Sequence, residues 1–203
     1  LEHDFFTLLE YDRRVGKFAS QPITLRWEDA TGCHRYTPDV AARYTEAAVL
    51  ADAALRTTLF EVKPREVLKR DWKEFKPKFR AAIAWTRERD FRFRIVTERQ
   101  IRTPYLDNVR FLMMFRGKRM TSDSESIEEI KRRIRETLYG FKRSTPRDLL
   151  NAITQVERLQ AEHLPWIWFL LNCNLIGCDL GKPLVMASDI WSLETPDTLG
   201  RRA

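Results

Sequence analysis

The spacing of apolar and polar residues predicts a run of helices and strands over residues 1–115. Leu1, Phe5, Leu8 and Leu9 fall on one face of a 3.6-residue repeat, which is typical of an amphipathic helix over residues 1–11. Beyond this helix, short segments with alternating residues, bounded by turn residues or proline, predict strands. The expected strands cover residues 17–27, 33–44, 56–63 and 91–97, and the expected helices cover residues 67–89 and 103–115.

Three places in this region need a separate interpretation. Residues 28–32 contain turn-forming residues and are expected to form a hairpin turn. Residues 45–55 are rich in alanine, which favours a helix, although their position between two strands favours a hairpin or a small inserted helix. Pro77 lies within the expected basic helix, so this helix either bends there or begins near Lys76.

A different order of elements is expected in the C-terminal part of the chain. A polar connector at residues 117–126 separates two predicted domains, 1–120 and 121–203. Thr145 is the expected N-cap of a helix whose first residue is a proline. The expected helices of this part are 126–138, a second one from 145 and 157–172, and the expected strands are 175–180 and 184–190. Three helices followed by a β-hairpin is the order of a winged helix-turn-helix module, so we expect a smaller winged-helix domain here.

Composition indicates a globular protein without a membrane partner. The chain has 203 residues, of which 43% are hydrophobic and 32% charged. The longest apolar run, at residues 164–171, contains a proline and is too short to span a bilayer. The three cysteines (Cys33, Cys173 and Cys178) form an odd and sparse set, which favours free thiols in a reducing compartment. We therefore expect a cytoplasmic protein.

Positive charge is concentrated in the middle of the chain. Residues 1–60 carry a net charge of −2 and residues 121–203 carry −1. Residues 61–120 hold 18 Lys and Arg against 8 Asp and Glu, a net charge of +10. Such a segment is typical of a protein that binds a polyanion, most simply a nucleic-acid backbone, although an ordinary basic surface is the alternative.

The candidate chemistry lies at the N-terminal edge of this basic segment. Glu61 and Lys63 are two residues apart on a predicted strand, so their side chains leave the same face, and Val62 points into the core. Asp39 follows a proline, which removes one ladder donor, so it is expected at a strand start or edge. Two carboxylates beside an ammonium could hold a hard divalent cation and orient a water, or they could form an ordinary surface salt bridge.

These residues belong to a longer ordered set of short motifs. The set consists of Leu1-Glu2-x-Asp4-Phe5, Ser20-Gln21-Pro22, Arg35-Tyr36-Thr37-Pro38-Asp39, Glu61-Val62-Lys63-Pro64 and Phe93-Arg94-Ile95-Val96-Thr97-Glu98. Through them, residues 1–120 resemble the catalytic domain of TnsA, the endonuclease subunit of heteromeric cut-and-paste DNA transposases. Asp39, Glu61 and Lys63 on their own would suggest only the wider restriction-endonuclease-like superfamily, with its PD-(D/E)XK motif. Residues 121–203 also resemble the second domain of that family, although no sharp motif marks them.

The resemblance implies a fold and a site. The expected architecture is an α/β protein with a restriction-endonuclease-like mixed sheet flanked by helices, followed by the winged-helix domain. Glu2, Asp39 and Glu61 are implied as acids that bind Mg²⁺, with Mn²⁺ as a substitute and the Val62 carbonyl as a further ligand. Some family members have glutamine where this chain has Glu61, and a glutamate fits the wider superfamily. Lys63 is implied as the catalytic residue that orients or deprotonates the attacking water, or holds the scissile phosphate.

The expected DNA contacts come from residues outside this set of acids. Gln21 lies beside the active-site strands in sequence, where it could face DNA or simply occupy an edge strand. The candidate phosphate contacts in the basic helix are Lys69, Arg70, Lys73, Lys76, Lys78 and Arg80, several of which could instead be solvated. His163 with Cys173 and Cys178 could suggest zinc, but without a fourth ligand or a C-x-x-C pair the cysteines are better interpreted as core residues.

The resemblance also implies partners and a function. The expected activity is Mg²⁺-dependent cleavage of one strand, at the 5′ ends, of transposon termini. The expected partners are transposon-end DNA, a TnsB-like transposase subunit and a TnsC-like AAA+ regulator, in a bacterial cytoplasm. The low net charge of residues 121–203 favours protein docking over DNA binding for that domain. Two alternatives remain at this point: a stand-alone restriction or repair nuclease, and a non-catalytic DNA-binding assembly subunit.

Overall fold

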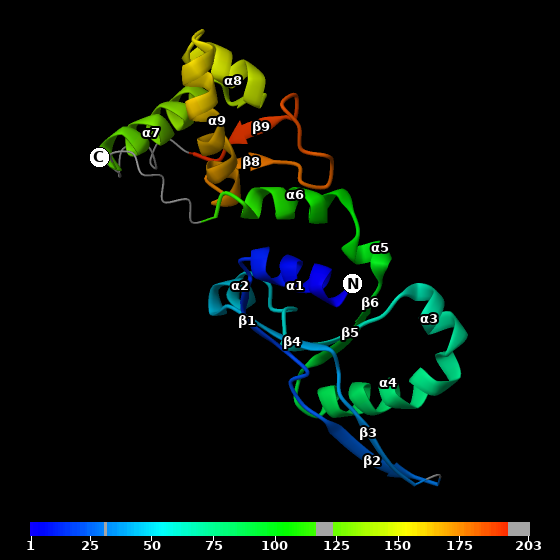
Figure 1. Cartoon of the computed structure of the whole chain (residues 1–203). Coiled ribbons are helices and arrows are strands. Elements are labelled where there is room, and N and C mark those ends of the chain that lie inside the picture. Colours follow the sequence, from blue (N-terminus) through cyan, green and yellow to red (C-terminus); the bar gives the residue numbers. More distant parts are fainter. Residues whose placement is uncertain (31, 117–123, 195–203) are drawn as a thin grey trace. The chain divides into compact units, whose positions relative to one another are not determined.

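The protein is described here from a computed structural model that covers residues 1–30, 32–116 and 124–194 (Figure 1). The chain divides into two compact units, Leu1–Leu106 (unit 1) and Asp107–Ala203 (unit 2). The division falls within helix α6 (Pro104–Met113). The boundary expected at residues 120 and 121 lies outside the described residues. None of the described helices is long and apolar enough to cross a membrane.

Unit 1 is built on a four-stranded mixed sheet in the order β1-β4-β5-β6. β4 is antiparallel to both β1 and β5, and β6 is parallel to β5. The strands are β1 (Val15–Ser20), β4 (Val40–Tyr44), β5 (Thr58–Val62) and β6 (Arg92–Val96). A mixed α/β fold of this kind fits the restriction-endonuclease-like class expected for this part of the chain.

Two apolar clusters cover the two faces of this sheet because its strands alternate their side chains. Phe60 and Val62 on β5 pack with Phe5 and Leu9 of α1 (Glu2–Tyr11). On the other face, Phe93 and Ile95 of β6 pack against Phe79 of α4 (Trp72–Arg87). Figure 1 shows α1 and α4 on opposite faces of the sheet. The remaining helices of unit 1 are α2 (Glu46–Ala51), α3 (Arg65–Arg70) and α5 (Glu98–Ile101).

A two-stranded hairpin stands apart from the main sheet. It consists of β2 (Leu25–Asp29) and β3 (Gly32–Tyr36), which pair in antiparallel register. The turn expected at residues 28–32 is therefore confirmed, but two predicted long strands are each split. The strand predicted at 17–27 breaks at Gln21, which has φ of +45° and precedes a proline. The strand predicted at 33–44 breaks at residues 37–39, where Pro38 cannot donate to a ladder.

The predicted basic helix is two helices, α3 and α4, that meet at Asp71. The expected helix start near Lys76 is wrong, because α4 begins at Trp72 and continues through Pro77. The lost amide donor of Pro77 falls on an exposed side of the helix, where water can hydrogen-bond the unpaired carbonyl. Residues 45–55 form a short helix, α2, whose N-cap Thr45 accepts a hydrogen bond from the Ala48 amide.

Unit 2 contains three further helices and a small sheet. The helices are α7 (Ser124–Phe141), α8 (Pro146–Ile153) and α9 (Glu157–Asn172). The strands β7 (Arg143–Ser144), β8 (Ile176–Cys178) and β9 (Ile190–Ser192) pair in the order β7-β9-β8. The predicted cap is confirmed, since Thr145 accepts a hydrogen bond from the Asp148 amide. The strand predicted at 184–190 is wrong over most of its length, because the chain there forms a turn and β9 begins only at Ile190.

One buried side chain holds the preceding segment, residues 180–184, in place. Asn108 of α6 is 5% exposed. Its amide nitrogen donates to the carbonyls of Leu180 and Lys182 at 2.8 and 2.7 Å, and its oxygen accepts from the Leu184 amide at 2.9 Å. A segment without regular structure thereby has its backbone groups paired.

Candidate active site

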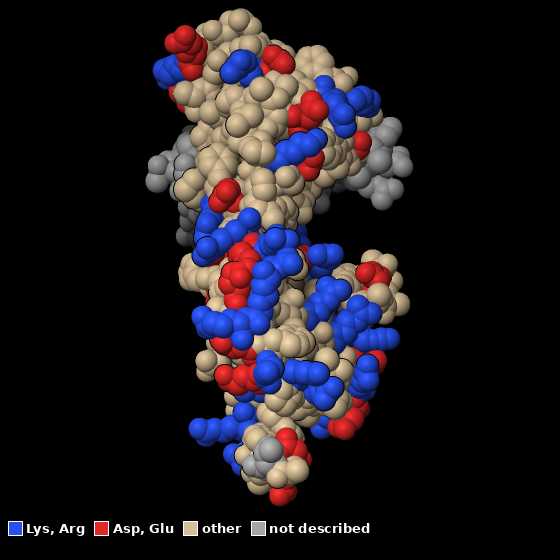
Figure 2. All heavy atoms as spheres, turned by 90° about the vertical axis from the view of Figure 1, so that its right-hand side faces the viewer, with Lys and Arg blue, Asp and Glu red and all other residues tan. Residues whose placement is uncertain are grey.

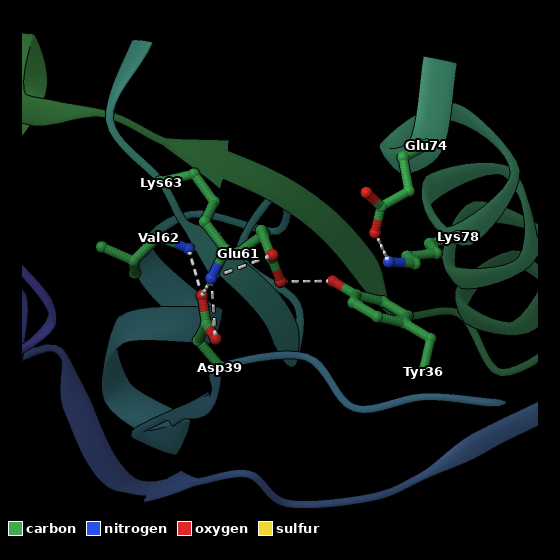
Figure 3. Close-up of polar contacts among 7 residues, drawn as sticks. All are labelled: Tyr36, Asp39, Glu61, Val62, Lys63, Glu74 and Lys78. Carbon is green, nitrogen blue, oxygen red and sulfur yellow. Dashed lines mark hydrogen bonds and ion pairs between the residues drawn. The ribbon is translucent and has the colours of Figure 1, made fainter. Parts of the chain in front are cut away.

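Two strands and a short extended segment bring three predicted residues together (Figure 3). Asp39 stands immediately before β4, as its proline neighbour predicted, and Glu61 lies on the adjacent strand β5. Lys63 follows β5, and its backbone amide donates to Val96 of β6, which extends the strand direction by one residue. The side chains of Glu61 and Lys63 consequently leave the same face, as the two-residue spacing predicted.

One ammonium joins the two carboxylates. Lys63 Nζ lies 3.1 Å from Asp39 Oδ2 and 3.3 Å from Glu61 Oε1. The Val62 amide donates to the same Asp39 oxygen at 2.7 Å. The side chains of Glu61, Asp39 and Lys63 are 3%, 14% and 25% exposed, so these charges meet in a half-buried position and not on an open surface. This burial argues against an ordinary surface salt bridge.

Sequence patterns did not single out Tyr36, which is the fourth member of the cluster. Its hydroxyl donates to Glu61 Oε2 at 2.5 Å, across 25 positions of sequence. The ring belongs to the apolar cluster under α4 and meets Phe79 edge to face. The available signal was its position three residues before Asp39 in the Arg35–Asp39 motif, but only the tertiary fold shows which acid it contacts.

Burial and mutual charge shift the pKa values of the cluster. Burial raises the pKa of Glu61, and the hydrogen bond from Tyr36 only partly offsets this rise. Burial lowers the pKa of Lys63, but the charges of Glu61 and Asp39 raise it by more than burial lowers it. The pKa therefore lies above its usual value. Burial and the contact with Glu61 place the pKa of Tyr36 far above its usual range. Lys63 is therefore an ammonium at neutral pH, and Tyr36 is a hydrogen-bond donor.

The oxygen donors of this cluster suit a hard divalent cation. Carboxylates are the ligands that Mg²⁺ prefers, and Asp39 and Glu61 converge on one point. In an extended strand a residue's carbonyl leaves the same edge as its amide, so the Val62 carbonyl is directed to the side where its amide meets Asp39. Over residues 1–30, 32–116 and 124–194, no group of three or more His, Cys, Asp or Glu side chains is arranged to hold a metal ion. Glu2 is the exposed first residue of α1, and its role as a third acid stays a prediction.

The six basic candidates divide into two sets. Lys69, Arg70 and Lys78 each form an ion pair with a neighbouring acid, at 2.8, 2.7 and 2.6 Å respectively. Lys73, Lys76 and Arg80 are exposed and have no ion pair with any residue that the structure describes. Because these three are spaced at i, i+3 and i+7, they lie on one face of α4. Figure 2 shows many Lys and Arg side chains on the side of unit 1 that faces right in Figure 1.

The other candidate residues have separate positions. The backbone amide of Gln21 donates to the Asp39 carbonyl at 2.8 Å, so Gln21 is adjacent to the site, and its contact with DNA stays a prediction. Lys76 and Arg80 line a groove of about 450 Å³ beside Trp27 of the hairpin. All three cysteines are free thiols, but Cys173 and Cys178 are only half-buried and not core residues as expected, and Cys33 is exposed. His163 is buried, with its Nδ1 2.6 Å from the Leu159 carbonyl.

Comparison with known proteins identifies the part of the chain that contains this cluster. Residues 12–98 match the family model described as TnsA-like endonuclease N terminal. The matched segment includes Asp39, Glu61, Lys63 and all of α4, whereas Glu2 precedes it. The comparison with curated proteins gave no significant match.

Proposed function

We propose that the protein, whose residues 12–98 match the family model described as TnsA-like endonuclease N terminal, is the metal-dependent endonuclease subunit of a cut-and-paste transposase. It cuts one DNA strand, at the 5′ ends, of transposon termini. Its partners are a TnsB-like transposase subunit and a TnsC-like AAA+ regulator in a bacterial cytoplasm. The observation that carries this proposal is the convergence of Asp39, Glu61 and Lys63 within the matched segment.

Asp39, Glu61 and the Val62 carbonyl would hold Mg²⁺ or Mn²⁺, and Glu2 would be a further ligand. The ion, when bound, would supply positive charge beside the scissile phosphate and a water of lowered pKa. The chain's own contribution is to fix these oxygens in advance. The Val62 amide and Lys63 orient Asp39, while Tyr36 and Lys63 orient Glu61 from opposite sides.

Lys63 acts in this proposal as a charged donor and not as a base. Its raised pKa means that it carries a proton at neutral pH, so it cannot accept one from water. An ammonium at this position would donate hydrogen bonds to a phosphate oxygen and stabilise the negative charge that develops there during hydrolysis. The unpaired cations Lys73, Lys76 and Arg80 would contact the DNA backbone, with Gln21 beside the cut site.

Unit 2 would be a winged-helix domain used for protein docking. The order of its elements and the sheet order β7-β9-β8 support this interpretation. In such a module α9 would be the helix that reads DNA. The exposed start of α9 has Glu157 and Glu162, and the intervening Arg158 is paired with Glu162 at 3.1 Å. This acidic surface is unsuited to phosphate and favours a protein partner.

A nicking assay on transposon-end DNA tests the proposal. Purified full chain would be incubated with labelled DNA and Mg²⁺, with and without the partner transposase. We expect cleavage that requires the metal, and loss of about 10²–10³-fold in rate for Asp39→Asn and for Lys63→Ala. Circular dichroism of both variants should match the wild type, because neither side chain belongs to an apolar cluster.

Lys69→Ala is the matched control, since this lysine is exposed and already paired with Glu66. It should cut at nearly the wild-type rate. Full activity without the partner transposase would favour a stand-alone nuclease. Metal-dependent binding of DNA with no cleavage under any of these conditions would favour a non-catalytic assembly subunit, and near wild-type nicking by Lys63→Ala would contradict its assigned role.

A further inference from the structure

The β2–β3 hairpin has two different faces. On the inner face, Leu25 and Tyr36 are buried and pack with Phe79 of α4. Trp27 and His34, also on this face, stack on one another with ring centroids 5.2 Å apart. Because side chains alternate along a strand, Arg26 and Arg35 must lie on the outer face. The packing against α4 therefore fixes the direction in which the arginines point.

Arg26 and Arg35 stand directly opposite one another in the hairpin register. Both are exposed, and neither guanidinium has a hydrogen bond, ion pair or ring contact with any residue within the described ranges. Like charges at directly opposite positions destabilise an antiparallel pair. Two neighbouring arginines present a fork-shaped set of donors that fits phosphate oxygens. The two arginines therefore repel one another in the free protein, and their donors fit the oxygens of a bound phosphate.

The outer face leads from this pair toward the catalytic acid. The next pair of side chains on that face, Thr24 and Thr37, is joined by a hydroxyl hydrogen bond of 2.8 Å. Asp39 follows two residues later along the same chain. Four residues of backbone span at most about 14 Å, so the Arg35 and Asp39 backbones lie no further apart than that. A DNA strand advances about 3.4 Å per nucleotide along its axis, so this backbone separation corresponds to about four nucleotides, to which the reach of the Arg35 side chain adds.

We propose that Arg26 and Arg35 form a phosphate clamp that holds the backbone of the DNA strand entering the active site. The clamp rests on the proposed endonuclease function and adds to it a contact that is independent of base sequence. A DNA strand is favoured over an acidic protein segment because the arginine pair is tied to Asp39 by so short a stretch of chain. In this role the hairpin guides the substrate on its outer face and supports the site on its inner face.

The test compares the full-length protein with the double variant R26T/R35T. Threonine suits an exposed strand position, so the hairpin should be kept, and thermal unfolding should occur at or above the wild-type midpoint because a like-charge pair is removed. Fluorescence anisotropy with labelled duplex and single-stranded DNA would be recorded at several salt concentrations without metal. Loss of two phosphate contacts should reduce the slope of log K against log salt by about 1.8 for duplex DNA and by about 1.4 for single-stranded DNA. The reduction should be the same for unrelated sequences.

R132Q is the matched control, because Arg132 is also exposed but is paired with Glu129 at 2.6 Å and is not among the candidate DNA contacts. It should leave the slope close to that of the wild type. An unchanged slope for R26T/R35T, a loss confined to one sequence, or absence of salt-dependent binding by the wild type would each overturn the clamp.

These outcomes are separable from failure of the proposed function. Wild-type protein that binds DNA through the arginine pair but never cleaves it would retain the clamp and reject the endonuclease. Wild-type protein that cleaves DNA while R26T/R35T binds and cleaves equally well would retain the endonuclease and reject the clamp.

Discussion

At the scale of single residues, Tyr36 controls the state of Glu61. Glu61 is almost fully buried, and burial alone would favour its neutral form, which cannot bind a cation. The Tyr36 hydroxyl donates to it at 2.5 Å and lowers its pKa, and Lys63 acts in the same direction. Tyr36 is therefore a positioning residue, which favours the charged form of a buried carboxylate and partly offsets the effect of burial on its pKa.

Tyr36→Phe should weaken metal binding and move the pH dependence of the enzyme. Because the pKa of Glu61 is raised, kcat/KM should begin to fall on acidification at a higher pH than it would with an ordinary glutamate. Removing the Tyr36 donor raises this pKa further, so the acid limb moves to higher pH. Mn²⁺ affinity at neutral pH should fall about 10–100-fold, as is usual for partners of metal ligands. Calorimetry with Mn²⁺ and pH profiles of kcat/KM measure the two effects.

Tyr139→Phe serves as the comparison, because that ring lies in unit 2 beside Lys142. An acid limb and Mn²⁺ affinity that are the same in Tyr36→Phe and wild type would show that the phenol only packs.

The same region shows what sequence patterns can predict about single residues. Period-two alternation predicted the shared face of Glu61 and Lys63, whereas Tyr36 meets Glu61 only through the tertiary packing of the hairpin on α4.

At the scale of elements, α3 and α4 together hold two sets of cations: exposed cations without an ion pair, and cations that neighbouring carboxylates neutralise. The triple variant of Lys73, Lys76 and Arg80 to alanine should reduce the slope of log K against log salt by about 2–3. The paired triple of Lys69, Arg70 and Lys78 to alanine removes the same formal charge, but its members already have carboxylate partners. The paired triple should reduce the slope of log K against log salt by less than half of the reduction expected for the first triple. Anisotropy titrations with one duplex measure both, and equal effects of the two triples would contradict this division.

The sequence predicts a strand or a helix correctly where the residues of that element determine its structure without help from tertiary contacts. The amphipathic pattern predicted α1, and the Thr145-Pro146 cap predicted the start of α8. The patterns did not predict that two long strands would each divide between the main sheet and the hairpin. That division depends on which neighbour each half pairs with, which is a tertiary property. β7 was missed because two residues carry no period.

At the scale of the whole molecule, each unit has a core of its own and should respond to its own substitutions. Asn108→Ala removes three hydrogen bonds to the turn at residues 180–184 and should lower the free energy of unfolding of unit 2 by about 2–3 kcal/mol. Urea denaturation measures the change, and hydrogen exchange should show lost protection around residues 180–190. DNA binding by unit 1 should remain.

Asn151→Ala is the comparison at an exposed asparagine, which should change stability by less than about 0.5 kcal/mol. An unchanged exchange rate at residues 180–184 in Asn108→Ala would contradict the role of Asn108.

Sequence could not predict this contact, because Asn108 lies far from its partners along the chain and has the pattern of a helix surface residue. The charge distribution, by contrast, predicted which unit has the basic surface.

The ammonium of Lys63 between two carboxylates has a practical consequence. A pair of close acids normally needs a cation to remain together, and many such proteins lose structure when chelators remove it. Here the protein carries its own counter-ion. The apoprotein should accordingly tolerate EDTA during purification and storage, which allows DNA complexes to be assembled intact and the reaction to be started afterwards by adding a metal salt.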